Sequence, residues 1–151
     1  MRKILLKTVL SLMAAMLLFV LVFGDPLVLW NNLKLKENIL STQQQTITLH
    51  QVTPFVWDTV YTFSPYTSKE EIARVIGFSS ISIKETVSEG MTQLLFVDGN
   101  RVVCSVCAYP SAMGYGVSGL PSGQPIANET DAPKFNIHRR GGILWLQYLK
   151  E

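Results

Sequence analysis

The first thirty residues constrain this chain more than any other segment. Arg2, Lys3 and Lys7 precede an uncharged apolar run, Thr8–Phe23, and residues 24–26 then interrupt it with glycine, aspartate and proline. A positive start followed by an apolar core is typical of a signal peptide or a signal anchor. The segment therefore predicts delivery to or through a membrane, and this sets the compartment of everything that follows.

The length of the apolar run leaves two interpretations open. Thr8–Phe23 has sixteen residues, slightly more than the ~7–15 of a cleaved signal peptide. Ile4–Phe23 has twenty, which matches the ~20 that a spanning helix needs. Small residues before Asp25 offer a cleavage site, whereas Trp30 is a residue type that favours the membrane–water interface. We favour an uncleaved signal anchor over residues 1–25, a transmembrane helix that contacts the lipid bilayer through residues 4–23.

Charge orients the chain and excludes one class of partner. The positive-inside rule places the N-terminus in the cytoplasm and residues 25–151 outside, as a single-pass protein of the cell membrane. A cleaved leader would make the same residues periplasmic or secreted. The whole chain carries a net charge of +2, but residues 25–151 have ten basic against eleven acidic side chains and sum to −1. Because nucleic-acid binding needs a cationic face, we expect no nucleic-acid partner.

Residues 26–45 lie between the membrane segment and the predicted domain. Asp25 and Pro26 have the pattern of a helix N-cap followed by proline at the first helical position. Leucines and other apolar residues then recur at near-helical spacing up to a polar spacer, Ser41–Gln45. We interpret the segment as a short helix within a juxtamembrane stalk, in preference to an interaction helix, since such stretches are often solvated linkers.

Residues 46–151 predict one small α+β domain. Alternating apolar residues indicate strands over residues 46–50 and 57–63. Ser68 and Glu71 then form a capping box, and Ile72, Val75 and Ile76 follow at helical spacing before a glycine. This is the only clear helix that the pattern gives within the domain. Because it is short, we expect it to be held by packing against a sheet.

Further strands are predicted after this helix. They cover residues 81–84, 93–97, 101–109, 135–138 and 143–149. Asp98-Gly99-Asn100 between two of them is a strong hairpin signal. Leu94–Val97 is apolar on both faces, which is typical of a strand covered on both sides. The expected fold has two layers, an antiparallel sheet of about five to seven strands with one helix inserted after the second.

The segment between Pro110 and Pro133 is the first candidate for a binding surface. It is rich in proline and glycine and has no periodicity, and loops beyond ~12–15 residues in compact domains are often functional. Met113, Tyr115 and Leu120 are its candidate binding residues. The alternative is that these side chains cover the sheet. Residues 114–119 also match Gly-x-Gly-x-x-Gly, but prolines follow where a nucleotide site needs a helix.

Cys104 and Cys107 are the strongest candidates for a reactive site. Outside the cytoplasm such a pair predicts a disulfide, a redox centre, or two buried free thiols. In an extended strand their Cα atoms would lie ~10 Å apart on opposite faces, beyond the ~7 Å that a disulfide tolerates. We therefore favour two free thiols over a disulfide, and a disulfide over redox activity.

No other set of residues in the sequence indicates an enzyme active site. His50 and His138 would have to converge on the cysteines to bind zinc, and their spacing gives no reason to expect it. The chain contains neither Gly-x-Ser-x-Gly nor His-Glu-x-x-His. We expect no metal, no cofactor and no catalytic residue.

Residues 57–72, with the hairpin strand Leu94–Val97, resemble small uncharacterised bacterial proteins that carry a lipoprotein or signal-anchor start and an extracytoplasmic domain. The resemblance implies a bacterial cell envelope and no particular activity. This chain departs from the lipoprotein members because it has no N-terminal cysteine.

Two function classes follow. The first is a noncatalytic, membrane-tethered protein whose domain binds an envelope protein or peptide. The second is an envelope thiol–disulfide redox protein that uses Cys104 and Cys107.

Overall fold

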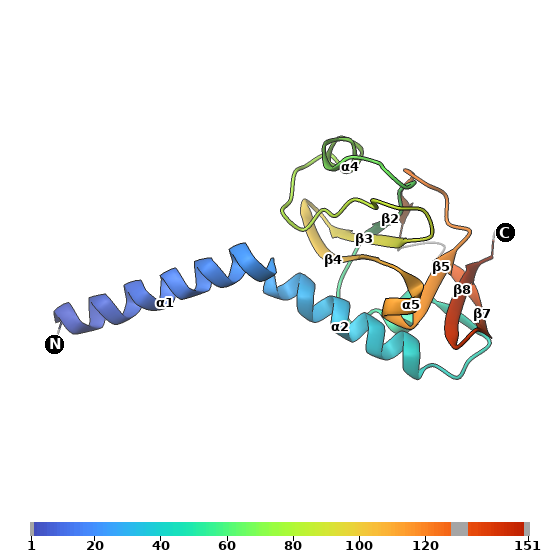
Figure 1. Cartoon of the computed structure of the whole chain (residues 1–151), viewed down its shortest axis with the longest axis horizontal. Coiled ribbons are helices and arrows are strands. Elements are labelled where there is room, and N and C mark those ends of the chain that lie inside the picture. The colour runs from blue at the N-terminus through green and yellow to red at the C-terminus, as the bar shows by residue number, and fades with distance from the viewer. Residues whose placement is uncertain (1, 128–132, 150–151) are drawn as a thin grey trace.

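The computed structural model describes residues 2–127 and 133–149 of the 151-residue chain. Its elements, in order, are α1 (Arg2–Phe23), α2 (Pro26–Ser41), β1 (Thr46–Thr48), α3 (Leu49–Val52), β2 (Thr59–Tyr61), α4 (Lys69–Ile76), β3 (Thr92–Asp98), β4 (Arg101–Ala108), α5 (Pro110–Met113), β5 (Tyr115–Ser118), β6 (Ile126–Ala127), β7 (Lys134–Arg140) and β8 (Ile143–Tyr148). Helix α1 extends away from a domain formed by all the other elements (Figure 1).

The strands form two four-stranded sheets. Sheet A has the order β1-β7-β8-β5, and sheet B has the order β4-β3-β2-β6. Strand β5 pairs with β8 in parallel, whereas the other described pairs are antiparallel. The α+β class is thus confirmed, but the expectation of a single antiparallel sheet is wrong. Alternation reveals strands, and it carries no information on which strands share a sheet.

Local signals located several elements correctly. The β3–β4 hairpin turns at Gly99-Asn100, and β7–β8 turns at Gly141-Gly142, where both φ angles are positive (61° and 78°). Helix α4 begins as expected, since the Ser68 hydroxyl accepts a hydrogen bond from the Glu71 amide at 3.2 Å. It ends at Gly77, whose φ is 89°.

Other local expectations are wrong. Residues 49–52 continue from β1 as the short helix α3, whereas alternation predicts a strand up to residue 50. The segment 81–84 is irregular. Its Ile83 is buried and its Ile81 is exposed. The alternation of apolar residues in this segment therefore does not mark a strand. It arises because the Ile83 side chain packs against α4 while Ile81 is exposed.

The main core lies between the two sheets and α2. Leu94 and Phe96 of β3 face it together with Phe135 of β7 and Leu144 of β8. Leu95 points to the opposite face of sheet B, where it packs in a second cluster that includes Ile72 of α4 and Val102 of β4. Strand β3 is therefore covered on both sides, as its continuous apolar run predicts.

Helix α2 belongs to the domain, which corrects the interpretation of residues 26–45 as a stalk. Its predicted cap is present, with the Asp25 carboxylate accepting a hydrogen bond from the Leu27 amide at 2.9 Å. Leu35 and Ile39 are fully buried in the main core, and Val28 packs in the second cluster. The apolar stripe of this helix therefore covers the sheets, and the domain begins before residue 46.

Two asparagines of α2 cover the free edge of sheet B. Asn31 donates its side-chain amide to the Val103 carbonyl at 2.8 Å. Asn32 donates to the Ser105 carbonyl at 3.0 Å and accepts from the Ser105 amide at 2.9 Å. The Asn32 amide thus takes the place of a neighbouring strand's peptide group on β4. At Val103 and Ser105 this edge therefore cannot pair with a strand of another chain.

Helix α1 differs from the rest of the chain. The side chains of Ile4, Leu5 and Leu6, which point in three different directions around the helix, are 66–69% exposed. Within residues 2–127 and 133–149, no helix combines the length with the apolarity that crossing a membrane requires.

Candidate functional site

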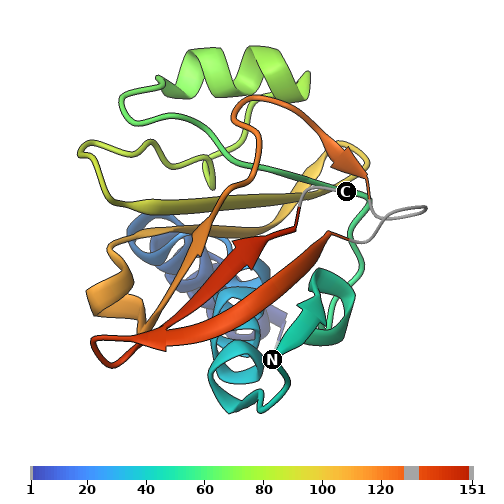
Figure 2. The same ribbon diagram turned by 90° about the vertical axis from the view of Figure 1, so that its right-hand side faces the viewer.

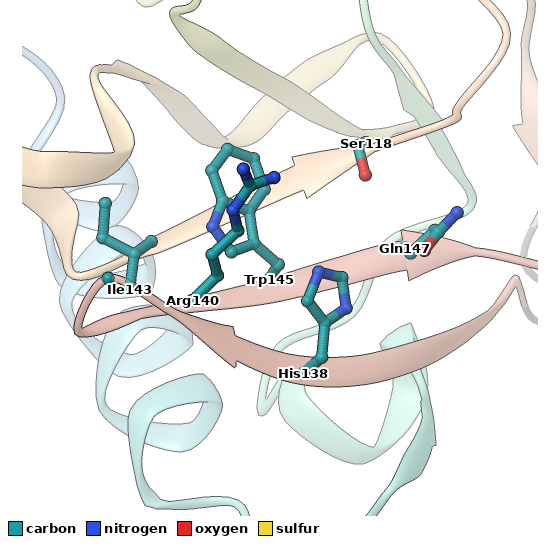
Figure 3. Close-up of a pocket in the computed structure, with 7 residues that line it drawn as sticks. Ser118, His138, Arg140, Ile143, Trp145 and Gln147 are labelled. Atoms are coloured by element: carbon teal, nitrogen blue, oxygen red, sulfur yellow. The ribbon is translucent and has the colours of Figure 1, made fainter.

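The outer face of sheet A holds a shallow hollow of about 500 Å³ (Figure 3). The side chains that define it come from three adjacent strands, and we call them the Trp145 face: Ser118, His138, Arg140, Trp145 and Gln147. In Figure 2 this face of sheet A points toward the viewer, and α2 and α1 lie behind the sheet. The Trp145 face is therefore at the opposite end of the molecule from α1.

Strand alternation and register bring these side chains together. Phe135, Leu144 and Leu146 point into the core, so the residues between them point outward. Trp145 is paired with His138 of β7 on one side and with Gly116 of β5 on the other. Gln147 lies in the next row, between Asn136 and Ser118. The site thus stands on regular strands, which hold side chains more precisely than loops do.

Gly116 leaves the space in which the Trp145 ring packs against β5. A Cβ atom at residue 116 would lie 2.6 Å from Cζ3 of Trp145, closer than two carbon atoms can approach. The indole therefore lies directly over the backbone of β5. This contact also accounts for the middle glycine of the Gly-x-Gly-x-x-Gly match. Residues 115–118 form a strand, and no helix follows in residues 119–127, so the match lacks the helix N-terminus of a dinucleotide site.

The Trp145 face is cationic. Lys134, His138 and Arg140 alternate along the outward side of β7, and the four strands of sheet A contain no aspartate or glutamate. Within the part of the chain that the structure describes, no hydrogen bond or ion pair engages the side chains of His138 and Arg140. An aromatic platform beside the Arg140 guanidinium and the His138 imidazole suits a partner that carries carboxylates.

The predicted binding residues Met113, Tyr115 and Leu120 are in a different environment. Met113 and Tyr115 are buried in the main core, and Leu120 packs against it half-buried. The segment that holds them is not a loop throughout, because α5, β5 and β6 lie within it, while residues 128–132 are outside the described residues. Their burial agrees with the alternative interpretation, in which these side chains cover the sheet.

The two cysteines are free thiols on β4. Cys104 is fully buried, and its thiol donates a hydrogen bond to the Asn32 side-chain oxygen at 3.0 Å. Burial raises the pKa of the Cys104 thiol well above its ordinary value. Burial also raises the pKa of the Cys107 thiol, although the nearby Lys84 ammonium opposes that effect. A thiol-redox site needs the opposite shift, because the thiolate is the reacting form.

We expect neither thiol to react readily in the native protein. At mildly alkaline pH an aromatic disulfide reagent should label Cys104 only on unfolding, since the thiol is buried and protonated. Cys107 should react slowly. Counting labelled thiols in native and urea-unfolded protein tests this, with a Cys107→Ala variant to assign the signal. Rapid labelling of native Cys104 would contradict the expectation.

The structure adds residues that the sequence did not single out. The sequence offers His138 as a candidate only for a zinc site or a hydrolytic set, and it does not point to Trp145 or Arg140. The sequence signal for these residues is the alternation within residues 134–148, in which polar and cationic side chains recur at every second position and face outward. Within the described residues, no group of three or more histidine, cysteine, aspartate or glutamate side chains is placed to hold a metal ion. His50 lies against the Trp57 ring, at 5.6 Å between ring centroids.

Comparisons with protein-family models, with curated proteins and with solved structures found no match to this chain.

Proposed function

We propose that this protein is a noncatalytic binding module tethered to the bacterial cell membrane. Helix α1 inserts its apolar side chains into the lipid bilayer, and the Trp145 face binds an acidic segment of an envelope protein or peptide. The observation that supports this most directly is the placement of two surfaces. Helix α1, whose apolar side chains are exposed, lies at one end of the molecule, and sheet A, which carries the Trp145 face, lies at the other (Figures 1 and 2).

The tether is supported by the exposure of α1. Leu10, Leu12 and Leu17 are each more than 60% exposed, in addition to the three residues near the helix start. Apolar surface left in water costs about 25 cal/mol per Å², and a helix that is apolar all round is expected in lipid or in a protein core. The cations Arg2, Lys3 and Lys7 put the domain on the extracytoplasmic side by the positive-inside rule.

The partner is supported by the charge of sheet A. Arg140 can bind a carboxylate through two parallel hydrogen bonds, and His138 lies two residues before it on the same side of β7. Trp145 supplies a rigid, half-buried aromatic surface between them and β5. Aromatic and arginine side chains are the types that most often dominate binding energy in interfaces. A face directed away from α1 is free to meet a partner at a distance from the bilayer.

One vesicle experiment tests both halves of the proposal. The full chain should float with phosphatidylcholine vesicles and recruit a fluorescent oligoglutamate peptide to them. A chain that begins at Gly24 should stay in the aqueous fraction and still bind the peptide. The double variant Arg140→Gln, Trp145→Ala should float normally and bind the peptide at least about tenfold more weakly, a loss of ~1.4 kcal/mol.

The matched control is Arg74→Gln, which removes an exposed cation from α4 on another side of the domain. It should leave flotation and peptide affinity unchanged. A full chain that remains aqueous would overturn the tether. Peptide affinity that is equal in the double variant and in the control would overturn the assignment of the Trp145 face.

A further inference from the structure

A second hollow, of about 200 Å³, lies beside the free edge of β4. Its walls come from α2, from the irregular segment after α4, and from α5 and β5. Cys107, Met113 and Tyr115, which the sequence nominated separately, all line it. Lys36 and Lys84 line it as well. It is separate from the Trp145 face, with which it shares no lining residue.

The charged groups of this hollow have one sign. None of the described residues that line it is an aspartate or glutamate. The nearest acids in sequence are engaged elsewhere, since Glu37 pairs with Lys34 at 2.8 Å and the Glu85 carboxylate accepts a hydrogen bond from the Lys69 amide at 3.0 Å. Among the described residues, neither Lys36 nor Lys84 has an ion-pair partner. Two unpaired ammonium groups around a concave site raise the local concentration of anions.

Two buried hydroxyl groups in the hollow also lack partners. The Tyr115 side chain is 1% exposed and that of Ser105 is 3% exposed. Neither hydroxyl has a hydrogen-bond partner within residues 2–127 and 133–149. Buried polar groups are nearly always hydrogen-bonded, and leaving one unpaired costs roughly 1–3 kcal/mol. Burial raises the pKa of the Tyr115 hydroxyl, so it remains a proton donor at neutral pH.

The edge of β4 supplies a further donor. The side chains of Asn31 and Asn32 occupy this edge at Val103 and Ser105. Because backbone groups alternate between the two edges of a strand, the amide of Cys107 is the next to face outward. Cys107 lines the hollow. The third asparagine of α2, Asn38, does not cover it, because its side-chain amide donates to the Val52 carbonyl at 3.2 Å. The edge therefore stays open at the hollow.

We propose that this hollow binds a small oxyanion, a carboxylate or phosphate group, between Lys36 and Lys84. The Tyr115 hydroxyl and the Cys107 amide donate hydrogen bonds to it, and the first of these bonds gives the buried Tyr115 hydroxyl a partner. Drug-sized ligands occupy ~300–1,000 Å³, so a hollow of about 200 Å³ fits a small anion or the charged end of a longer molecule. This inference is independent of the proposed partner of the Trp145 face.

Calorimetric titration of the full chain tests the proposal, in nonionic detergent at low ionic strength. Inorganic phosphate and succinate are titrated separately, and saturable binding of either supports the site and identifies the group. Lys36→Met together with Lys84→Met should weaken binding at least about tenfold. Tyr115→Phe should weaken it about threefold, with the melting temperature unchanged or raised, because it removes only an unpaired hydroxyl.

Lys34→Met is the matched control, since it removes the same charge from the opposite side of α2. An exposed ion pair such as that of Lys34 with Glu37 contributes little to stability. Circular dichroism melting of each variant confirms folding before titration. The proposal is overturned if neither anion binds at millimolar concentration, or if the double lysine variant binds as tightly as Lys34→Met.

Discussion

A chain that begins at Thr46 is expected to remain unfolded, whereas a chain that begins at Gly24 should keep the native domain. The first variant lacks α2, which buries Val28, Leu35 and Ile39. Burying an aliphatic side chain of this size stabilises a protein by about 1.5–3 kcal/mol. The loss of all three therefore amounts to about 5–9 kcal/mol, which is comparable with the whole net stability of a typical domain.

The truncation also uncovers the edge of sheet B. Without Asn32, the amide and carbonyl of Ser105 lose their partners, and the exposed edge can pair with another chain. Circular dichroism and size-exclusion chromatography distinguish the two shortened chains. A cooperative thermal transition in the chain that begins at Thr46 would show that α2 is dispensable, and would restore the stalk interpretation.

A pair of point variants makes the same test within the full chain. Leu35→Ala should lower the free energy of unfolding by about 2–5 kcal/mol, since Leu35 is fully buried. Leu33→Ala removes the same atoms from the same helix, but Leu33 is 63% exposed, and its effect should stay within about 0.5 kcal/mol. Equal effects would contradict the packing of α2 described here.

Gly116→Ala is expected to lower the free energy of unfolding by about 1–3 kcal/mol, because the new Cβ displaces the Trp145 ring. The backbone of Gly116 is ordinary strand, so the cost arises from the ring and not from the φ angle. In a Trp145→Ala background the same substitution should cost almost nothing. The two substitutions are therefore coupled, and a double-mutant cycle in urea measures the coupling.

The cycle also provides a functional readout. Gly116→Ala should weaken oligoglutamate binding to about the level of Trp145→Ala, since both remove the indole from its position. Gly116→Ala could instead lower the free energy of unfolding equally in both backgrounds. The strain would then lie in the backbone, and the result would contradict the contact between residue 116 and the Trp145 ring.

The elements that the sequence predicted correctly are those that local chemistry determines. Ser68 and Gly77 mark the two ends of α4, Asp25 marks the start of α2, and residues 98–100 mark a hairpin. Each signal involves residues within a few positions of one another. Such hydrogen bonds and turns form in the same way wherever the segment is placed, so a pattern in the chain is enough to locate them.

The features that the sequence did not predict depend on distant partners. Helix α2 looks like a solvated stalk until its asparagines meet β4, more than seventy residues later. Met113 and Tyr115 look like exposed loop residues in the sequence, but most of their surface packs in the main core. Likewise, the Trp145 face exists only because β5, β7 and β8 are neighbours in that register. Alternation within one strand cannot show which residues lie across from it.

Pairing of β1 with β7 also determines when the domain can close. Thr46 contacts Asn136, which lies ninety positions later in the chain. Strands β7 and β8 are the last two described strands to leave the ribosome. Folds dominated by such distant contacts form slowly, because the loop must close before the contact stabilises it. Until residues 134–148 have emerged, the nascent chain exposes the inner surfaces of α2 and β3. During that interval the incomplete domain is therefore a substrate for chaperones and proteases.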